Sequence, residues 1–253
     1  CSSDLKSVFP VLAAAFSVLL PLSATHALSQ QKAIGLATHM ENQVSGIISG
    51  QQRTLTPGSD VYQYEIIKTN QNSKTQLAFL DSTVLSIGPM SEVNLDSFVY
   101  NPDRNAGDVV VNMGRGTFRF ITGSQEKRNY KIVTPVATIG VRGTVFHVKC
   151  DDNGCQVVLQ EGGVTLQLAD GTTTDIDQPG WGIAITPTGF VGVPMQWPGG
   201  AGDPFGAGWQ QFADAGAPQT TGATGPAFSS PLFSAFFSPS SNVVPPCLTP
   251  SCN

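Results

Sequence analysis

Short apolar runs separated by turn residues constrain the fold of this chain more than any other feature. From about residue 43 to Val193 such runs recur roughly every 8–12 residues, with Gly, Pro, Asn and Asp between them. Strands of this length and spacing are typical of an all-β sandwich or barrel. The strands predicted by this pattern are 61–68, 75–80, 83–87, 92–98, 109–113, 117–121, 130–133, 144–149, 156–159, 164–168, 182–185 and 190–193.

Several of these runs alternate apolar and polar residues with a period of two. In 117–121, for example, Phe118 and Phe120 point to one side and Arg119 points to the other. Each such strand covers a core on one side only, which is typical of antiparallel sheets. We therefore predict a single all-β domain of many short antiparallel strands, a sandwich or β-roll. A β-solenoid is the alternative, because the strand spacing is even.

Composition divides the chain into four segments. Residues 1–27 read as a signal peptide, 28–57 as a lead-in with the first strand, and 58–193 as the β domain. Within the lead-in, residues 28–40 are interpreted as a short helical stretch. Residues 194–253 form a tail rich in Pro and Gly, which predicts loose order.

Aromatic residues distinguish this tail from a plain linker. It contains ten Pro and no Lys or Arg, yet it carries several Phe residues, among them Phe233, Phe236 and Phe237. The interpretation we favour is that these residues dock back on the β domain. The alternative is that they anchor another component of the cell envelope.

The N-terminal segment has the pattern of a secretory signal. Lys6 precedes an apolar run at 8–22, and Thr25 and Ala27 occupy the small-residue positions of a cleavage site. A membrane anchor is the alternative, but the run is shorter than the roughly 20 residues that a spanning helix needs. We expect no transmembrane segment after cleavage. The sequence opens at Cys1 without an initiator Met, so we expect its start to be truncated.

Four cysteines fall into two local pairs, Cys150 with Cys155 and Cys247 with Cys252. The first pair brackets Asn-Gly, a strong hairpin-turn signal, so its two side chains would face each other across a tight hairpin. A disulfide here would contribute about 2 kcal/mol. We predict disulfides for both pairs, with free thiols or a metal site as alternatives. Disulfides agree with an exported protein.

Charge and motifs exclude several classes of function. Residues 150–253 carry eight acidic and no basic side chains, which argues against a nucleic-acid partner. The sequence has no nucleophile elbow, zinc-protease helix, phosphate loop or dinucleotide fingerprint. We therefore expect neither an enzyme nor a cofactor.

Two longer stretches carry a family resemblance. Residues 77–93 read L-A-F-L-D-S-T-V-L-S-I-G-P-M-S-E-V, and residues 130–146 read Y-K-I-V-T-P-V-A-T-I-G-V-R-G-T-V-F. Two shorter runs, 116–120 and 159–164, fit in the expected order. Over these residues the chain is similar to the FecR domain family, whose members are periplasmic sensor or regulator domains.

Turn-forming residues dominate these matching runs. Pro135 would hold Thr134 extended, and Gly140 and Gly143 would permit positive φ at a sharp reversal. Arg142 between them could clamp loop carbonyls or a carboxylate, or could contact a ligand. The positions singled out as structural are Gly88, Pro89, Thr134, Pro135, Gly140, Arg142, Gly143 and Thr144.

The resemblance implies a role in sensing at the bacterial cell envelope. Well-known FecR proteins join this domain through one membrane helix to a cytoplasmic domain that controls a sigma factor. This chain shows no such segment before the signal peptide, and a Pro/Gly tail replaces the family's C-terminal portion. We therefore predict a stand-alone exported binding module, periplasmic or secreted, with a protein partner in the envelope. The alternative is a secreted structural or surface module that binds matrix or glycans.

Overall fold

A computed structural model describes residues 31–100, 107–189, 191–202 and 204–205 of the chain. All of them belong to one compact unit, Cys1–Gly216; the second unit is Ala217–Asn253. The described residues form 18 strands and one three-residue 3₁₀ helix, η1 (Lys127–Asn129). The all-β prediction is therefore confirmed. The expected signal peptide and the pair Cys247 and Cys252 lie outside the described residues.

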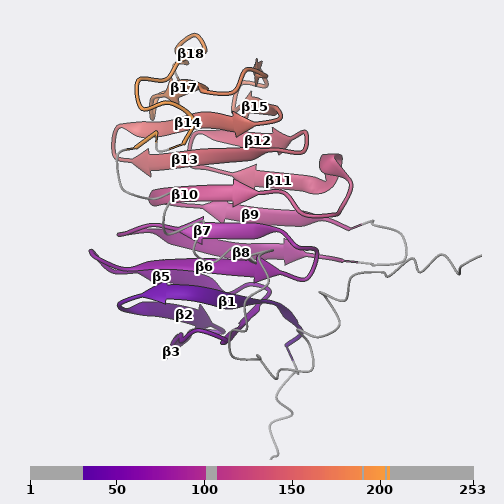
Figure 1. Cartoon of the computed structure of the whole chain (residues 1–253), viewed down its shortest axis with the longest axis vertical. Coiled ribbons are helices and arrows are strands. Elements are labelled where there is room, and N and C mark those ends of the chain that lie inside the picture. Colours follow the sequence, from indigo (N-terminus) through magenta and orange to yellow (C-terminus); the bar gives the residue numbers. More distant parts are fainter. Residues whose placement is uncertain (1–30, 101–106, 190, 203, 206–253) are drawn as a thin grey trace, which may run out of the picture. The chain divides into compact units, whose positions relative to one another are not determined.

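Sheet A contains nine strands, which are hydrogen-bonded in the order β18-β17-β14-β13-β10-β7-β6-β1-β4 (Figure 1). All of its neighbours are antiparallel. Their bounds are β18 Met195–Gln196, β17 Trp181–Ile185, β14 Gly154–Glu161, β13 Val145–Asp151, β10 Gly116–Ile121, β7 Val84–Ile87, β6 Lys74–Phe79, β1 Ala33–Glu41 and β4 Asp60–Tyr62.

Sheet B also contains nine strands, in the order β16-β15-β12-β11-β9-β8-β5-β2-β3. Only the pair β9 and β11 is parallel among the described strands of this sheet. Their bounds are β16 Thr173–Ile176, β15 Val164–Leu168, β12 Ala137–Val141, β11 Tyr130–Val133, β9 Val109–Met113, β8 Glu92–Phe98, β5 Ile66–Thr69, β2 Val44–Ile48 and β3 Gln51–Thr54.

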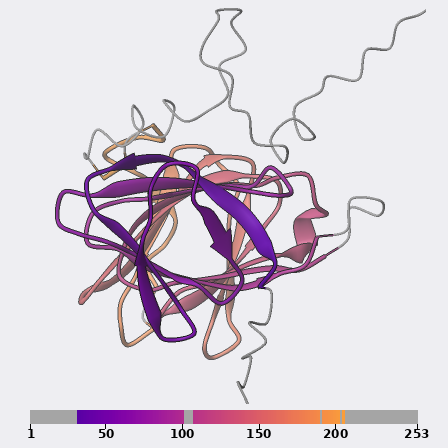
Figure 2. The same cartoon turned by 90° about the horizontal axis from the view of Figure 1, so that it is seen from below.

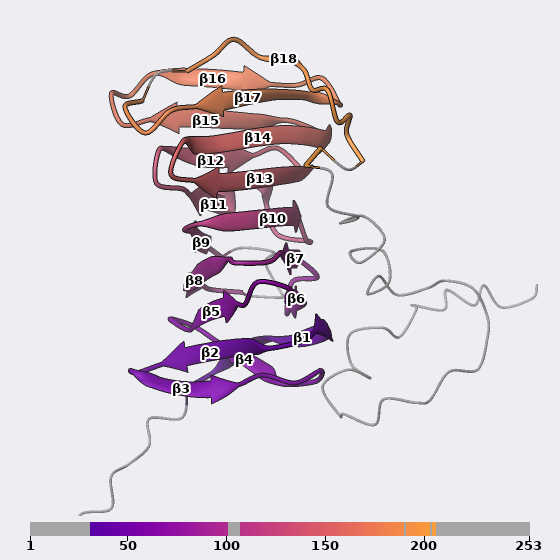
Figure 3. The same ribbon diagram turned by 90° about the vertical axis from the view of Figure 1, so that its left-hand side faces the viewer.

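The chain builds both sheets together by crossing from one to the other after one or two strands. The hairpin β6–β7 belongs to sheet A, the next hairpin β8–β9 to sheet B, and β10 to sheet A again. Apart from β4 and β3, which lie at the edges outside β1 and β2, strand number therefore increases from one end of each sheet to the other (Figure 3). Every crossing needs a sharp corner, and glycine or proline stands at several of them, for example Gly88 and Pro89 after β7 and Gly143 after β12.

One continuous core lies between the sheets, which enclose it when the molecule is viewed along the direction in which the strands stack (Figure 2). Leu77, Leu85, Phe120 and Phe146 lie directly opposite one another on neighbouring strands of sheet A, all fully buried. From sheet B, the Tyr130 ring meets the edge of Phe120, with ring centroids 6.0 Å apart. Burial of each large side chain contributes about 1.5–3 kcal/mol. The predicted shared interior is confirmed.

The prediction of a helical stretch at 28–40 is wrong, because β1 occupies Ala33–Glu41. This strand pairs with both β4 and β6, so its backbone groups find partners that an isolated short helix would lack. Ile34 and Ala37 enter the core. A Cβ on Gly35 would lie 2.4 Å from the carbonyl oxygen of Ala78, so only glycine permits this close strand approach.

The predicted strand 61–68 is divided in two, because the chain crosses there from sheet A to sheet B. Tyr64 adopts φ of 65° at the crossing, and its side chain is exposed. Next to it, the fully buried Glu65 carboxylate accepts two hydrogen bonds from the Arg53 guanidinium, at 2.9 and 3.0 Å. The pairing of this buried charge fixes the corner.

Two further predictions need correction at the C-terminal half. Gly140 does not adopt positive φ, because it lies inside the unpredicted strand β12, between β11 and β15. The predicted strand 190–193 is reduced to a single bridge between Ile185 and Val191, and Phe190 lies outside the described residues.

Candidate recognition surface

The corner after β7 carries the first motif of the matching runs, Gly88 and Pro89. The Thr69 hydroxyl donates a hydrogen bond to the Gly88 carbonyl at 2.5 Å and accepts one from the Ser91 amide at 3.0 Å. The Ser91 hydroxyl donates to the Pro89 carbonyl at 3.0 Å and accepts from the Thr117 amide at 3.1 Å. This corner therefore ties a strand of sheet B to the start of β10 in sheet A.

Thr134 and Pro135 form the turn of the hairpin β11–β12. The Thr134 hydroxyl donates to the Ala137 carbonyl at 2.8 Å and accepts from the Ala137 amide at 3.0 Å. The Thr134 amide also donates to the Ala137 carbonyl at 2.9 Å. Because Pro135 has a fixed φ and no amide hydrogen, it suits the first central position of this turn.

Gly143 and Thr144 lie where the chain passes from β12 in sheet B to β13 in sheet A. Gly143 adopts φ of 71°, as expected for a glycine at a reversal. The Thr144 amide donates to the Thr122 hydroxyl at 2.9 Å, and the Thr144 hydroxyl donates to the Glu161 carbonyl. A Cβ on Gly162 would lie 2.1 Å from the Gly143 carbonyl oxygen. The glycines allow two neighbouring crossings to touch.

Arg142 is exposed beside this corner and meets a carboxylate. One guanidinium nitrogen lies 3.7 Å from the nearest Asp175 oxygen, and both side chains are at least half exposed. Such an exposed pair contributes little to stability. The guanidinium also lies close to Gly163. Arg142 therefore contacts a carboxylate, as one interpretation of the sequence expected, and it keeps donors available to a ligand.

The motif residues do not converge on one site. Gly88 donates from its amide to the Thr117 carbonyl near the start of β10, whereas Thr144 bonds to Thr122 just after its end. The disulfide belongs to the first of these ends, since Cys150 lies opposite Gly116. Apart from Gly140, which lies inside β12, each motif residue stands at a turn or corner or directly beside one.

The predicted disulfide between Cys150 and Cys155 is confirmed. The two residues lie opposite each other on β13 and β14, and both are buried. At the hairpin tip the Asp151 carboxylate accepts a hydrogen bond from the Asn153 amide at 2.8 Å, and Gly154 adopts φ of 114°. The tip is thus a turn held by local hydrogen bonds, as the Asn-Gly signal indicated.

A buried polar cluster around Asp81 was not singled out by the sequence analysis. The Asp81 carboxylate accepts hydrogen bonds from the Tyr130 hydroxyl at 2.7 Å, the Thr83 hydroxyl at 2.8 Å and the Gln125 amide at 3.2 Å. It also accepts one from the Thr83 backbone amide at 2.9 Å. The matching run 77–93 contains Asp81 and Thr83, but Gln125 and Tyr130 come from distant parts of the sequence, so no local signal could identify them as partners.

Tyr130 links this cluster to the core between the sheets. Burial raises the pKa of its hydroxyl well above the ordinary value, and the adjacent Asp81 carboxylate adds to the effect. The hydroxyl therefore stays protonated and keeps donating to Asp81. The cluster joins the β6–β7 turn of sheet A to β11 of sheet B as a structural cross-link.

One row of outward side chains of sheet A is buried, although it lies on the face opposite the core, whereas the outward residues on either side of it, such as Thr117 and Lys149, are half-buried. A row of directly opposed residues crosses β6, β7, β10, β13 and β14. We call it the outer row of sheet A, and its members are Gln76, Ser86, Arg119, His147 and Val158, with exposed fractions of 1, 0, 6, 0 and 0 %.

Residues that follow β17 in the chain cover part of this row. The Trp197 ring lies against Gly182, next to Val158, and Phe205 meets His147 with ring centroids 6.5 Å apart. Trp197 and Phe205 also contact each other, at 6.3 Å. The chain after β18 therefore folds back over the outer face of sheet A.

Sheet B presents the contrasting face. A row of directly opposed residues crosses β8, β9, β11, β12 and β15, and each is at least partly exposed. We call it the outer row of sheet B, and its members are Asn94, Asn112, Val133, Thr138 and Gln167. Amide and hydroxyl groups predominate in it, which suits hydrogen bonding to a partner.

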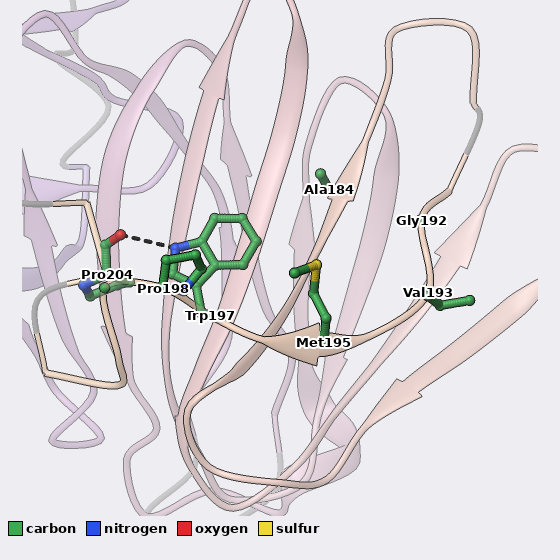
Figure 4. A pocket seen from close by; sticks show the side chains of 8 residues that line it. Ala184, Gly192, Val193, Met195, Trp197, Pro198 and Pro204 are labelled. Carbon is green, nitrogen blue, oxygen red and sulfur yellow. Dashed lines mark hydrogen bonds between the residues drawn. The ribbon is translucent and has the colours of Figure 1, made fainter.

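An apolar hollow of about 500 Å³ lies next to β18 (Figure 4). Met195 and Ala184 line one part of it, and Trp197 lines another, where the indole nitrogen donates to the Pro204 carbonyl at 2.9 Å. Val193 at its rim is 81 % exposed and Met195 is 52 % exposed.

Neither a metal-binding cluster nor a membrane-crossing element is found within the described ranges. No group of three or more His, Cys, Asp or Glu side chains there could hold a metal ion. The same residues include no helix with the length and apolar character needed to cross a bilayer.

Residues 65–165 match a family model described as FecR protein. This segment runs from the corner before β5 to the start of β15, and it includes every motif residue discussed above. The resemblance inferred from the sequence is therefore confirmed for these residues. No curated protein matches the chain.

Three solved structures resemble parts of the chain. Two are crystal structures of a candidate anti-sigma factor from Parabacteroides distasonis, each with 18 % identity and a TM-score of 0.43, covering 52 % of this chain. The chain spans 59 % of the length of that protein. The third is a cell surface anchoring domain with 32 % identity and a TM-score of 0.26, which covers 28 % of this chain and 93 % of its own.

Proposed function

We propose that this chain is an exported, non-enzymatic sensory or regulatory module of the bacterial cell envelope, which acts by binding a protein partner. Two observations support the proposal. Residues 65–165 are FecR-like, and the sequence before the β domain has the pattern of a secretory signal. All motif residues except Gly140 lie at or beside turns and corners, which supports a module that works through its surface.

The contrast between the two outer faces carries the proposal. Within residues 65–165 the outward side chains in the row of sheet A are buried, so they cannot meet a partner directly. Sheet B offers the Asn, Thr and Gln side chains of its outer row instead. Such groups can exchange hydrogen bonds with water for hydrogen bonds with a partner. We therefore place the partner on the outer face of sheet B.

Affinity capture from envelope extract tests this placement. The bait is the full chain, and the test variants are Thr138→Arg and Gln167→Arg, which put a long cation on the outer row of sheet B. Gln52→Arg is the matched control, because β3 belongs to the same sheet but lies outside residues 65–165. We expect a specific protein to be retained by the original chain and the control and lost by both test variants.

Capture of that protein by all three variants would exclude sheet B as the contact face. The absence of any specific partner would contradict the binding role itself. Cell fractionation tests export separately: the mature chain is expected in the periplasm or the medium. Recovery chiefly from the outer surface, bound to glycan or matrix, would favour the structural alternative.

A further inference from the structure

Gly140 lies on the outer face of sheet B, and neither its conformation nor its packing requires a glycine. It points away from the core, because Ile139 and Val141 on either side of it are buried. Its φ is not positive, and an added Cβ would meet only the Thr165 carbonyl oxygen, at 3.7 Å. A glycine inside a strand weakens the strand and often marks a close approach by a ligand or another backbone. The bare backbone at Gly140 therefore suits a group that approaches from outside the sheet.

The residues beside Gly140 form a short row with opposite charges at its ends. Lys131 on β11 and Thr165 on β15 lie directly opposite Gly140, and Asp175 on β16 lies opposite Thr165. Lys131 is exposed, and the Asp175 carboxylate accepts a hydrogen bond from the Thr165 hydroxyl. Gly140 is therefore a low point on the face, next to an exposed cation.

Three exposed cations gather around this low point and the end of β12. Lys131 lies opposite Gly140, and Arg142 lies two residues further along the chain, so both point outward from the same face. Lys127 of η1 lies over the next corner, since a Cβ on Gly143 would be 2.5 Å from its Nζ. The cations come from three separate elements, and the fold brings them together.

The chain leaves the donors of these three side chains available. Within the part of the chain that the structure describes, none of them makes a hydrogen bond, and only Arg142 has an ion-pair partner. That partner, Asp175, is 3.7 Å away, which exceeds hydrogen-bond distance, and it already accepts from Thr165. The Glu126 carboxylate pairs instead with Arg128, at 2.6 Å. A carboxylate from outside the chain could therefore meet unused donors here.

We infer that an acidic segment of the partner binds over Gly140 and places a carboxylate between Lys131 and Arg142. This inference rests on the proposed function and specifies the chemistry of the partner. The two cations are diagonal neighbours on adjacent strands, about 7–8 Å apart at their backbones, so long side chains can reach one group. A guanidinium binds a carboxylate through two parallel hydrogen bonds, and the ammonium adds a point charge.

The rest of the face favours a peptide over an acidic glycan. The row through Gly140 and the adjacent outer row of sheet B contain no aromatic side chain on which a sugar ring could stack. The outer row supplies amide and hydroxyl groups, which can bond to the backbone of a bound segment. Lys127 extends the positive charge to the corner, where a second carboxylate of the segment would lie.

Binding measurements with four variants of the full chain test the inference. Lys131→Glu and Arg142→Glu reverse the two charges, and Gly140→Val fills the low point with a side chain. Lys68→Glu is the matched control, because Lys68 is also a partly exposed outward cation of sheet B. It lies on β5, four strand spacings from β12, or about 19 Å. The probe is the protein that the original chain retains in the affinity capture described above.

We expect each charge reversal to raise the dissociation constant at least about tenfold, because a carboxylate would then face the partner's carboxylate. Gly140→Val should raise it by a similar factor, whereas Lys68→Glu should change it by less than about twofold. Circular dichroism checks that each variant is folded, and Gly140→Ala replaces Gly140→Val if the larger side chain prevents folding. A carbodiimide, which joins an ammonium to a touching carboxylate as an amide, should link Lys131 or Lys127 to an Asp or Glu of the probe.

Each contrary result has a distinct meaning. If the probe binds the charge-reversal variants as tightly as the original chain, the inference is overturned and the proposed function stands. If the original chain retains no specific protein, both are overturned. Competition by alginate, an acidic glycan, without any cross-link to a protein carboxylate would assign the cations to a glycan and overturn the inference as well.

Discussion

The outer faces of the two sheets have equivalent positions in the fold but opposite environments. Each sheet has nine strands, and each contributes alternate side chains to the shared core. On sheet A the outward row is buried and includes Arg119 and His147; on sheet B the outward row is at least partly exposed. The difference shows that polar residues in outward positions do not identify the exposed face.

The reason is that alternation reports only which side chains leave the core. A side chain that leaves the core meets either water or another part of the chain, and both environments accept Gln, Ser or Thr. Residues around Trp197 and Phe205 supply such a second layer over sheet A. The alternation pattern therefore does not show which outer row is exposed. The tertiary structure shows it, because Trp197 and Phe205 lie on sheet A.

The largest expected effect comes from a matched pair of valines, one on each outer face. Val158→Asp places a carboxylate under Trp197 in a fully buried position and should lower the free energy of unfolding by about 3 kcal/mol. Val133→Asp on sheet B should lower it by less than about 1 kcal/mol. Urea denaturation of both variants measures the difference, and equal losses would remove the contrast between the faces.

The disulfide of sheet A gives the next effect. Replacement of Cys150 and Cys155 by serine should cost about 2 kcal/mol, because the unfolded chain loses the constraint of the closed loop. The hairpin β11–β12 of sheet B is closed by Thr134 hydrogen bonds, so of these two hairpins reductant should affect the one in sheet A. Thermal unfolding with and without reductant checks this. A chain that is unaffected by reductant would contradict it.

The hydrogen bond from Tyr130 to Asp81 links the two sheets, so its contribution to stability does not depend on either outer face. Tyr130→Phe removes the hydrogen bond to the buried carboxylate and should cost about 1–2 kcal/mol at pH 8. The pKa of Tyr130 is raised in the folded state, so its stabilising contribution is complete below the unfolded pKa of about 10 and is lost as pH rises further.

The stability difference between the original chain and Tyr130→Phe should therefore shrink between pH 8 and pH 11. Urea denaturation at both pH values measures it. A difference that grows with pH would contradict the sign of the shift. Variants on either outer face should leave this pH dependence unchanged.

The smallest expected effect concerns Arg142 and Asp175 beside the outer face of sheet B. A double-mutant cycle with alanine at both positions should give a coupling below about 0.5 kcal/mol, because both side chains are largely exposed. A coupling of several times that value would show that the pair is shielded from water. The open character of sheet B would then need revision.

Local patterns predicted most of the strands because each short run combined alternation with a turn signal at its ends. They failed where pairing or crossing decided the outcome. Residues 33–41 form β1 because β4 and β6 flank it, and Gly140 lies inside β12 because β11 and β15 lie on either side. Tertiary pairing overrides local preference in such segments.

The candidate site was predicted less completely. Turn residues such as Thr134, Pro135 and Gly143 were recognised because their conformational requirements are local. Two partners of Asp81, Gln125 and Tyr130, lie 44 and 49 residues away, so no local pattern could connect them to it. The disulfide between Cys150 and Cys155 could be predicted because both cysteines lie in one hairpin, close together in the sequence.

By itself, the sequence determined that the chain forms many short strands, that one side of each strand faces a core, and where the chain must turn. These properties depend on a residue and its near neighbours. The tertiary structure alone decided that the strands divide between two sheets, and that the outer row of sheet A is buried while the outer row of sheet B is at least partly exposed. Burial is set by what lies above a side chain, and that is contributed by residues far away along the chain.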